Sequence, residues 1–277
     1  MQPAVDSAAP AATGVARIAE AFARARAQGR AALIPYVTAG VPDLPYLVPL
    51  LERMAQAGAD LIEVGIPFSD PLADGPVLQR AAALALARGT RVRAILETLG
   101  RQPLPVPVVF LTYVNPVLRF GPAAFLEAAR AAGVSGVIIP DLPWIEAGEM
   151  ATLARRQGLA LIPLVAPTST DRHVLSLKRA EGFIYGVSVT GVTGVRQTVD
   201  PGVVPLVERV RAHSTLPVAI GFGISTPEQA AAVGRIADGV IVGSALVRRI
   251  LDAEPGEALN TAAAFVGSLA AALRAGG

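Results

Sequence analysis

The sequence of 277 residues contains no cysteine, one lysine and two histidines. Without cysteine the chain can form no disulfide, no thiolate nucleophile and no cysteine-type zinc site. His173 and His213 lie far apart with no ligand pattern near them, which excludes a histidine-rich metal site. Lys178 is the one residue that could form a lysine Schiff base, and the helical-looking run 171–180 is a poor place for that chemistry.

Aromatic residues make up only 5% of the chain and charged residues only 17%, whereas 52% are hydrophobic, so we expect an aliphatic, tightly packed core. The net charge of +2 and the absence of a basic cluster argue against a nucleic-acid-binding protein. Proline, glycine or charge interrupts the apolar stretches before about 18 residues, which argues against a membrane span. Residues 1–14 are rich in alanine and proline and lack a basic start, so we expect a disordered extension of a cytoplasmic protein.

Short apolar runs alternate with longer alanine-rich segments of helical spacing from residue 32 onward. Uninterrupted apolar runs are typical of parallel strands that are covered on both faces. Eight such units in about 250 residues predict a (β/α)8 TIM barrel, with an extra N-terminal helix over 15–28 and no linker within 15–277. An open doubly wound sheet has the same alternation, but the number of units and the lack of a Gly-x-Gly-x-x-Gly turn favour the barrel. The eight runs are 32–37, 60–64, 106–111, 136–139, 160–165, 183–187, 218–220 and 239–242.

Active sites of TIM barrels lie in the loops after the strands, and the second of these windows contains three acids. Glu63 interrupts an aliphatic strand near its end, where burial should raise the pKa of its carboxyl group and suit it to acid–base catalysis. A buried structural glutamate is the alternative. Asp70 and Asp74 follow among prolines and glycines, and their spacing does not decide which of them faces the site.

Three later windows, 188–194, 221–225 and 242–245, are rich in glycine, serine and threonine. Glycines let the backbone approach an anion, and free N–H groups at a helix start can bind it without a lysine. Phosphate sites of TIM barrels recur in the loops after the last two strands. The sequence therefore predicts a phosphorylated substrate that is processed by carboxyl groups.

The segment 63–76, with the sequence EVGIPFSDPLADGP, resembles the second-strand signature of the tryptophan synthase alpha chain family. The segments 35–40, 113–116, 140–143, 191–194 and 221–224 agree with the same family in order, from about residue 15 to the C-terminus. The resemblance implies a lyase that cleaves indole-3-glycerol phosphate to indole and glyceraldehyde 3-phosphate. It implies that Glu63 protonates the indole ring carbon and helps to deprotonate the glycerol hydroxyl, and that Asp74 interacts with the indole N–H.

The same resemblance implies the residues that bind the substrate. It also implies mobile loops after the second and sixth strands, in which Thr193 meets Asp74 on closure. The implied substrate-binding residues are Tyr36, Tyr185 and Phe222 in the pocket, Thr193 on the mobile loop, and Gly194, Gly223, Gly243 and Ser244 at the phosphate. One departure is Val41, which stands where an acid or an aromatic residue is common in the family.

The family further implies a partner, the tryptophan synthase beta chain, in an α2β2 heterotetramer. Pyridoxal phosphate (PLP) would belong to that partner, with no cofactor in this chain, and the docking face would carry the loop 70–75 and the segment 140–143. The alternatives are a stand-alone lyase that releases free indole, a catalytically weak allosteric phosphate-binding subunit, and another phosphate-binding barrel such as a sugar-phosphate epimerase. Strong unassisted turnover would identify the first, the intact Glu63 and Asp74 argue against the second, and the lack of metal-binding histidines argues against the third.

Overall fold

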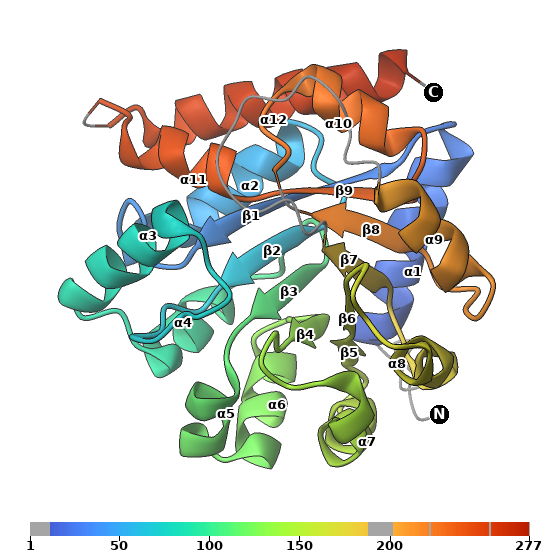
Figure 1. The fold of residues 1–277 in the computed structure, drawn as a ribbon. Helices are drawn as coiled ribbons and strands as arrows, with labels where there is room; N and C mark the ends of the chain where they lie inside the picture. Colours follow the sequence, from blue (N-terminus) through green and yellow to red (C-terminus); the bar gives the residue numbers. More distant parts are fainter. Residues whose placement is uncertain (1–11, 188–201, 222, 255, 277) are drawn as a thin grey trace, which may run out of the picture.

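The computed structural model describes residues 12–187, 202–221, 223–254 and 256–276, and its strands form a closed parallel barrel (Figure 1). The strands follow the order β5-β4-β3-β2-β1-β9-β8-β7-β6. β5 (Ala160–Ile162) and β6 (Leu164–Val165) occupy the two ends of this order, yet only Pro163 separates them in the chain. They are two halves of one barrel strand, so the predicted TIM barrel is confirmed.

Each predicted apolar run overlaps a barrel strand. Pro163 divides the run 160–165 because proline has no N–H to donate to the ladder. Its carbonyl still accepts a hydrogen bond from the Tyr185 amide at 3.0 Å, which continues the barrel across the interruption. The other strands are β1 (Ala32–Thr38), β2 (Ile62–Gly65), β3 (Val108–Leu111), β4 (Gly136–Ile138), β7 (Ile184–Val187), β8 (Val218–Gly221) and β9 (Gly239–Val242).

Helices surround the strands, and side chains cap the start of several of them. The Asp43 carboxylate accepts a hydrogen bond from the Leu44 amide at 2.8 Å, and Thr226 forms a capping box with Gln229. The helices are α1 (Gly14–Ala27), η1 (Leu44–Tyr46), α2 (Leu47–Gln56), α3 (Pro76–Ala87), α4 (Val92–Leu99), α5 (Val114–Phe120), α6 (Pro122–Ala131), η2 (Trp144–Glu146), α7 (Gly148–Arg156), α8 (Asp171–Ser176), η3 (Leu177–Arg179), α9 (Val203–Arg211), α10 (Pro227–Gly234), α11 (Ser244–Leu251) and α12 (Ala258–Ala275).

The predicted extra helix, α1, closes the N-terminal end of the barrel. Ile18 and Phe22 are buried among residues that point into the barrel, and the Phe22 ring lies 5.5 Å from that of Phe183. The Arg17 guanidinium donates to three carbonyls of the loops before β3 and β4, those of Gly133, Leu104 and Val106, at 3.0, 3.1 and 3.2 Å. The end that remains for chemistry is the C-terminal end of the strands. Residues 1–11 lie outside the described residues, so the expected disordered extension stays a prediction.

One helix in the described part of the chain, α12, is long and apolar enough to cross a membrane by length and composition. Its buried residues include Phe265, Val266, Leu269 and Leu273, and the helix packs against α2, α10 and α11. This packing makes α12 a helix of the outer layer of the barrel.

Candidate active site

Glu63 lies on β2 and is 1% exposed, at the register position opposite Tyr36 of β1. Its Oε2 atom has no hydrogen-bond partner among the described residues. Burial and the nearby negative charge of Asp74 raise the pKa of the Glu63 carboxyl to about 8. The site thus contains a carboxyl group that is protonated near neutral pH and free to bind a ligand.

Asp74 belongs to the loop after β2, which turns back toward the barrel. Its amide donates to the Pro71 carbonyl at 3.0 Å, and its own carbonyl accepts from the Gln79 side chain at 2.8 Å. Burial raises the pKa of Asp74 to about 6, and the Tyr113 hydroxyl acts in the opposite direction. Asp70 is exposed and accepts a hydrogen bond from the Ser69 hydroxyl at 2.7 Å. Asp74 is therefore the loop acid that the fold brings to Glu63.

Tyr36 and Tyr185, which the family resemblance implies as pocket residues, are buried near the two acids. The Tyr36 hydroxyl lies 3.3 Å from that of Thr38. Burial raises the pKa of both phenols, and so do the negative charges of Glu63 and Asp74. Both hydroxyls therefore keep their protons at neutral pH and can donate hydrogen bonds.

Two glycines that the sequence analysis did not assign make room for these tyrosines. A Cβ atom on Gly65 of β2 would lie 2.5 Å from Cζ of Tyr36, and one on Gly221 of β8 would lie 2.5 Å from the Tyr185 hydroxyl. Contacts under 3.0 Å are essentially never seen for real Cβ atoms. The absence of a side chain at Gly65 and at Gly221 therefore leaves the space that the two tyrosine side chains occupy.

The predicted phosphate residues lie at the ends of the last two strands. Gly223 follows β8 with a φ of +76°, a conformation that favours glycine, and Gly243 is the N-cap of α11, which starts at Ser244. The first N–H groups of a helix have no partner within it and can bind an anion. A Cβ atom on Gly243 would lie 3.6 Å from that of Tyr36, so this anion-binding end adjoins the pocket. Thr193, Gly194 and Phe222 lie outside the described residues.

Tyr113 is a site residue to which the sequence analysis gave no role. Its hydroxyl accepts a hydrogen bond from the Ala73 amide at 3.1 Å, and its presence lowers the pKa of the neighbouring Asp74. Its ring lies 5.4 Å from the ring of Phe68. Its position two residues after β3, in a loop at the C-terminal end of the strands, could have identified it as a candidate site residue.

The histidines and the lysine lie away from these acids in the chain. Nε2 of His173 is hydrogen-bonded to the Leu164 carbonyl at 3.0 Å, and Lys178 is an exposed residue of η3. Within the described ranges, no three His, Cys, Asp or Glu side chains are grouped so that they could bind a metal ion.

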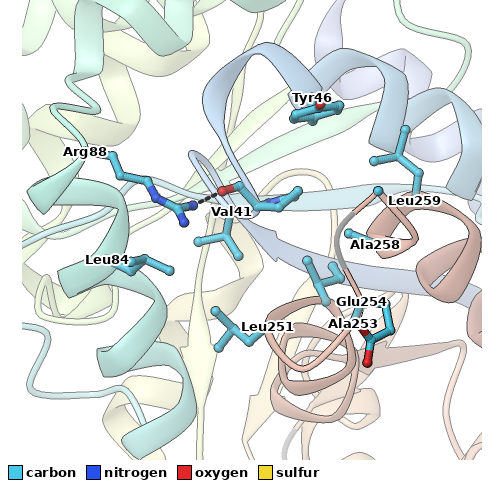
Figure 2. A pocket seen from close by; sticks show the side chains of 12 residues that line it. Val41, Tyr46, Leu84, Arg88, Leu251, Ala253, Glu254, Ala258 and Leu259 are labelled. Carbon is cyan, nitrogen blue, oxygen red and sulfur yellow. Dashed lines mark hydrogen bonds between the residues drawn. The ribbon is translucent and has the colours of Figure 1, made fainter.

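A separate hollow of about 220 Å³ lies between the loop after β1, α3, and the α11–α12 connection (Figure 2). The Arg88 guanidinium donates to the Pro42 carbonyl at its edge. Val41, the departure from the family pattern, is buried at 3% exposure and lines this hollow. Neither Glu63 nor Asp74 lines it, so the departure affects a neighbouring surface and not the acid pair.

The fold and the site define a TIM barrel with a buried glutamate and a partly buried aspartate of unequal pKa near the N-terminus of a helix, an arrangement typical of an acid–base enzyme. The family model for the tryptophan synthase alpha chain matches residues 22–274. The chain belongs to the tryptophan synthase alpha chain family.

Several members of this family are similar in sequence to this chain over most of their length. A tryptophan synthase alpha chain from Carboxydothermus hydrogenoformans is 48% identical over 239 residues, which cover 85% of this chain and 90% of the relative. One from Microcystis aeruginosa is 45% identical over 261 residues, covering 93% and 99%. A solved structure of Mycobacterium tuberculosis tryptophan synthase has a TM-score of 0.85 at 41% identity, covering 93% of this chain and 98% of that chain.

Proposed function

We propose that Glu63 and Asp74 are the catalytic residues of this lyase. As a tryptophan synthase alpha chain, the protein cleaves indole-3-glycerol phosphate to indole and glyceraldehyde 3-phosphate, the alpha-subunit step of tryptophan biosynthesis. The observation that carries the residue assignment is a buried glutamate near a partly buried aspartate, with pKa values of about 8 and about 6. Near pH 7 one of them holds a proton and the other is ionised, so the pair offers an acid and a base together.

The steps of the cleavage reaction follow from this assignment of an acid to Glu63 and a base to Asp74. The protonated Glu63 donates its proton to C3 of the indole ring, which makes the ring nitrogen positive. The Asp74 carboxylate accepts the N–H hydrogen bond and stabilises that charge. The Glu63 carboxylate then takes the proton of the glycerol hydroxyl next to the ring while the carbon–carbon bond breaks. The electron pair of that bond returns to the ring, so indole leaves neutral and the glycerol carbon becomes an aldehyde.

The remaining residues bind the substrate in this proposal. Tyr36, Tyr185 and Phe222 line the indole pocket. Gly194, Gly223, Gly243 and Ser244 bind the phosphate, and Thr193 meets Asp74 when the loops close. The support is the start of α11 at Ser244 and the closeness of Gly243 to Tyr36.

The proposal includes a tryptophan synthase beta chain as the partner in an α2β2 heterotetramer, with PLP bound by that partner and the complex in the cytoplasm. The family's alpha chain has no cofactor of its own. The loop before Asp74 carries Leu72, whose side chain is 92% exposed. An apolar side chain presented on a catalytic loop suits a surface that a partner covers.

The test is indole release from indole-3-glycerol phosphate by the purified chain, alone and with a beta chain added. We expect slow turnover alone and a many-fold increase with the partner. Glu63→Gln should lose about 10²- to 10⁴-fold in rate with its fold intact by circular dichroism. Fast turnover alone would identify a stand-alone lyase, and near-normal turnover of the Glu63→Gln variant would refute the acid–base assignment.

A further inference from the structure

Three consecutive peptide groups of the loop after β2 are hydrogen-bonded around Asp74. The Asp74 amide donates to the Pro71 carbonyl at 3.0 Å, a contact within the loop. The peptide group before it has a partner from outside the loop, because the Ala73 amide donates to the Tyr113 hydroxyl at 3.1 Å. The peptide group after it also has an outside partner, because the Asp74 carbonyl accepts from Nε2 of Gln79 at 2.8 Å.

Tyr113 is held in place independently of this loop. Its side chain is buried, at 2% exposure, in the connection between β3 and α5. Its ring lies 5.4 Å from that of Phe68. The next residue, Val114, donates its amide to Oδ1 of Asp141 at 2.9 Å, which ties this connection to the loop after β4. The Tyr113 hydroxyl is therefore a fixed acceptor for the Ala73 amide.

Gln79 is held by the helix in which it lies. Its amide donates to the carbonyl of Gly75, the N-cap of α3, at 3.0 Å. This bond closes the first turn of the helix and directs the side chain of Gln79 back over the helix start. The side-chain amide then reaches the Asp74 carbonyl, so the first turn of α3 supports the residue that precedes it.

We propose that Tyr113 and Gln79 are positioning residues, which hold the backbone on both sides of Asp74 and so direct its carboxylate toward the ring N–H of the substrate. The two side chains are called the Asp74 clamp below. This inference rests on the proposed function, because that function makes the ring N–H the hydrogen-bond partner of Asp74.

The direction of the Asp74 side chain depends closely on its backbone. The φ and ψ angles are the soft dihedrals of each residue, and the peptide groups before and after Asp74 define both of them. A single methylene group joins the carboxylate to Cα, so a rotation of either peptide group displaces the carboxylate. A catalytic group must be held within about 0.5 Å of its productive position.

Packing contributes little to holding this stretch of the loop. Leu72 and Ala73 are exposed, and Asp74 itself is only partly buried. Loops with few buried apolar contacts open easily, and hydrogen bonds from rigid elements are then the means of fixing them. The clamp supplies two such bonds, one from the loop after the neighbouring strand and one from the following helix.

The decisive experiment compares two ligands that differ only at the ring nitrogen, bound to the full-length chain with a beta chain present. The first is indol-3-ylpropyl phosphate, which lacks the hydroxyl next to the ring and cannot be cleaved. The second is the benzothiophene counterpart, in which sulfur replaces the N–H. The ratio of their Kd values measures the contact between Asp74 and the ring N–H, because every other contact is shared.

Tyr113→Phe and Gln79→Met each remove one hydrogen bond of the clamp and keep the approximate shape of the side chain. We expect each variant to reduce the preference for the indole ligand by about 3- to 10-fold, the range for one lost hydrogen bond, with little change for the benzothiophene ligand. The matched controls are Tyr46→Phe in η1 and Gln56→Met, an exposed residue of α2, and both should keep the wild-type ratio.

Turnover and amide exchange give two further measurements. In the proposed reaction Asp74 stabilises a charge that forms after binding, so kcat should fall by about 10-fold in each clamp variant while KM changes little. Hydrogen exchange of the Ala73 amide, followed by NMR, reads the Tyr113 bond without any ligand. It should be several-fold faster in Tyr113→Phe than in wild type.

Equal losses of affinity for both ligands, with an unchanged ratio in both variants, would overturn the inference and leave Tyr113 and Gln79 as structural residues. A wild-type chain that neither cleaves indole-3-glycerol phosphate nor prefers the indole ligand would contradict the proposed function instead. Exchange of the Ala73 amide then decides whether the loop is clamped: faster exchange in Tyr113→Phe supports the clamp, and an unchanged rate refutes it.

Discussion

Replacement of Gly65 by alanine should damage both stability and activity, although it adds a single methyl group. The new Cβ would lie 2.5 Å from Cζ and 2.8 Å from Cε2 of Tyr36, and still closer to the hydroxyl oxygen. The Tyr36 ring has little room to swing, since it is only 5% exposed and its hydroxyl lies 3.3 Å from that of Thr38. Either the ring or β2 must move.

The size of the effect follows from the packing. Overpacking of a well-filled core costs about 1–3 kcal/mol of unfolding free energy. At about 2–4 °C per kcal/mol for a chain of this class, the melting temperature should fall by about 2–12 °C. Because the displaced hydroxyl borders Glu63 and Asp74, a shift of about 1 Å should also reduce kcat/KM by about 10²-fold.

Thermal unfolding and indole release measure the two effects. Gly148→Ala is the matched control, because nothing beyond its chain neighbours and its own helix backbone lies within 4 Å of its Cβ position at the start of α7. It should leave activity unchanged and stability equal or about 1 kcal/mol higher. Adding Tyr36→Phe removes the worst overlap, so the double variant should lose less stability than the sum of the two single changes. A Gly65→Ala protein as stable and as active as Gly148→Ala would refute the steric argument.

Two further predictions concern buried carboxyl groups. Folding raises the pKa of Glu63 from 4.5 to about 8, so the folded state binds this proton more tightly and the unfolding free energy should fall as the pH rises between those values. Glu63→Gln should remove that part of the slope in urea unfolding measured across this pH range, and an unchanged slope would contradict the raised pKa. Asp60 accepts from both terminal nitrogens of Arg30 at 2.6 and 2.9 Å, with side chains 11% and 8% exposed. Asp60→Ala leaves the buried Arg30 charge unpaired and should cost about 3–5 kcal/mol in urea unfolding, whereas a loss under 1 kcal/mol would show that water reaches the guanidinium.

The alternation of apolar runs predicted a parallel sheet because each strand is buried on both faces, and the number of units together with the lack of a Gly-x-Gly-x-x-Gly turn favoured the barrel over an open sheet. The structure differs from the predicted pattern only within single elements. The run 160–165 contains two short strands because Pro163 cannot donate to the ladder. The alanine-poor segment after β1 begins as the 3-10 turn η1, which carries Pro45, before α2 starts at Leu47. Neither departure changes the order of the strands, since the apolar pattern fixes which residues are buried and proline alters only the hydrogen bonds.

The site was less predictable, because its contacts join residues that are distant in the chain. Glu63 could be recognised from its own strand, as a charge in an apolar run. Spacing alone could not choose between Asp70 and Asp74, since the turn at Pro71 decides which of them points inward. Tyr113 and Ala73 are 40 residues apart and meet only because β2 and β3 are neighbours in the barrel.

The unpaired oxygen of Glu63 connects the stability of the barrel with its chemistry. Buried side-chain atoms without a partner in the described part of the chain are Oε2 of Glu63, Oγ1 of Thr112, Oγ of Ser135 and Nε of Arg209. Glu63 is the one carboxyl group in that set, and an unpaired buried carboxyl group destabilises the fold unless it holds a proton or meets a ligand. The raised pKa of Glu63 meets the first condition, and in the proposed reaction the substrate would meet the second. The burial of Glu63 thus lowers the stability of the barrel and also raises the pKa of a group that the proposed reaction uses to give and regain a proton. This free-energy cost arises at the C-terminal end of the strands, where the proposed reaction takes place, and not at the end that α1 closes.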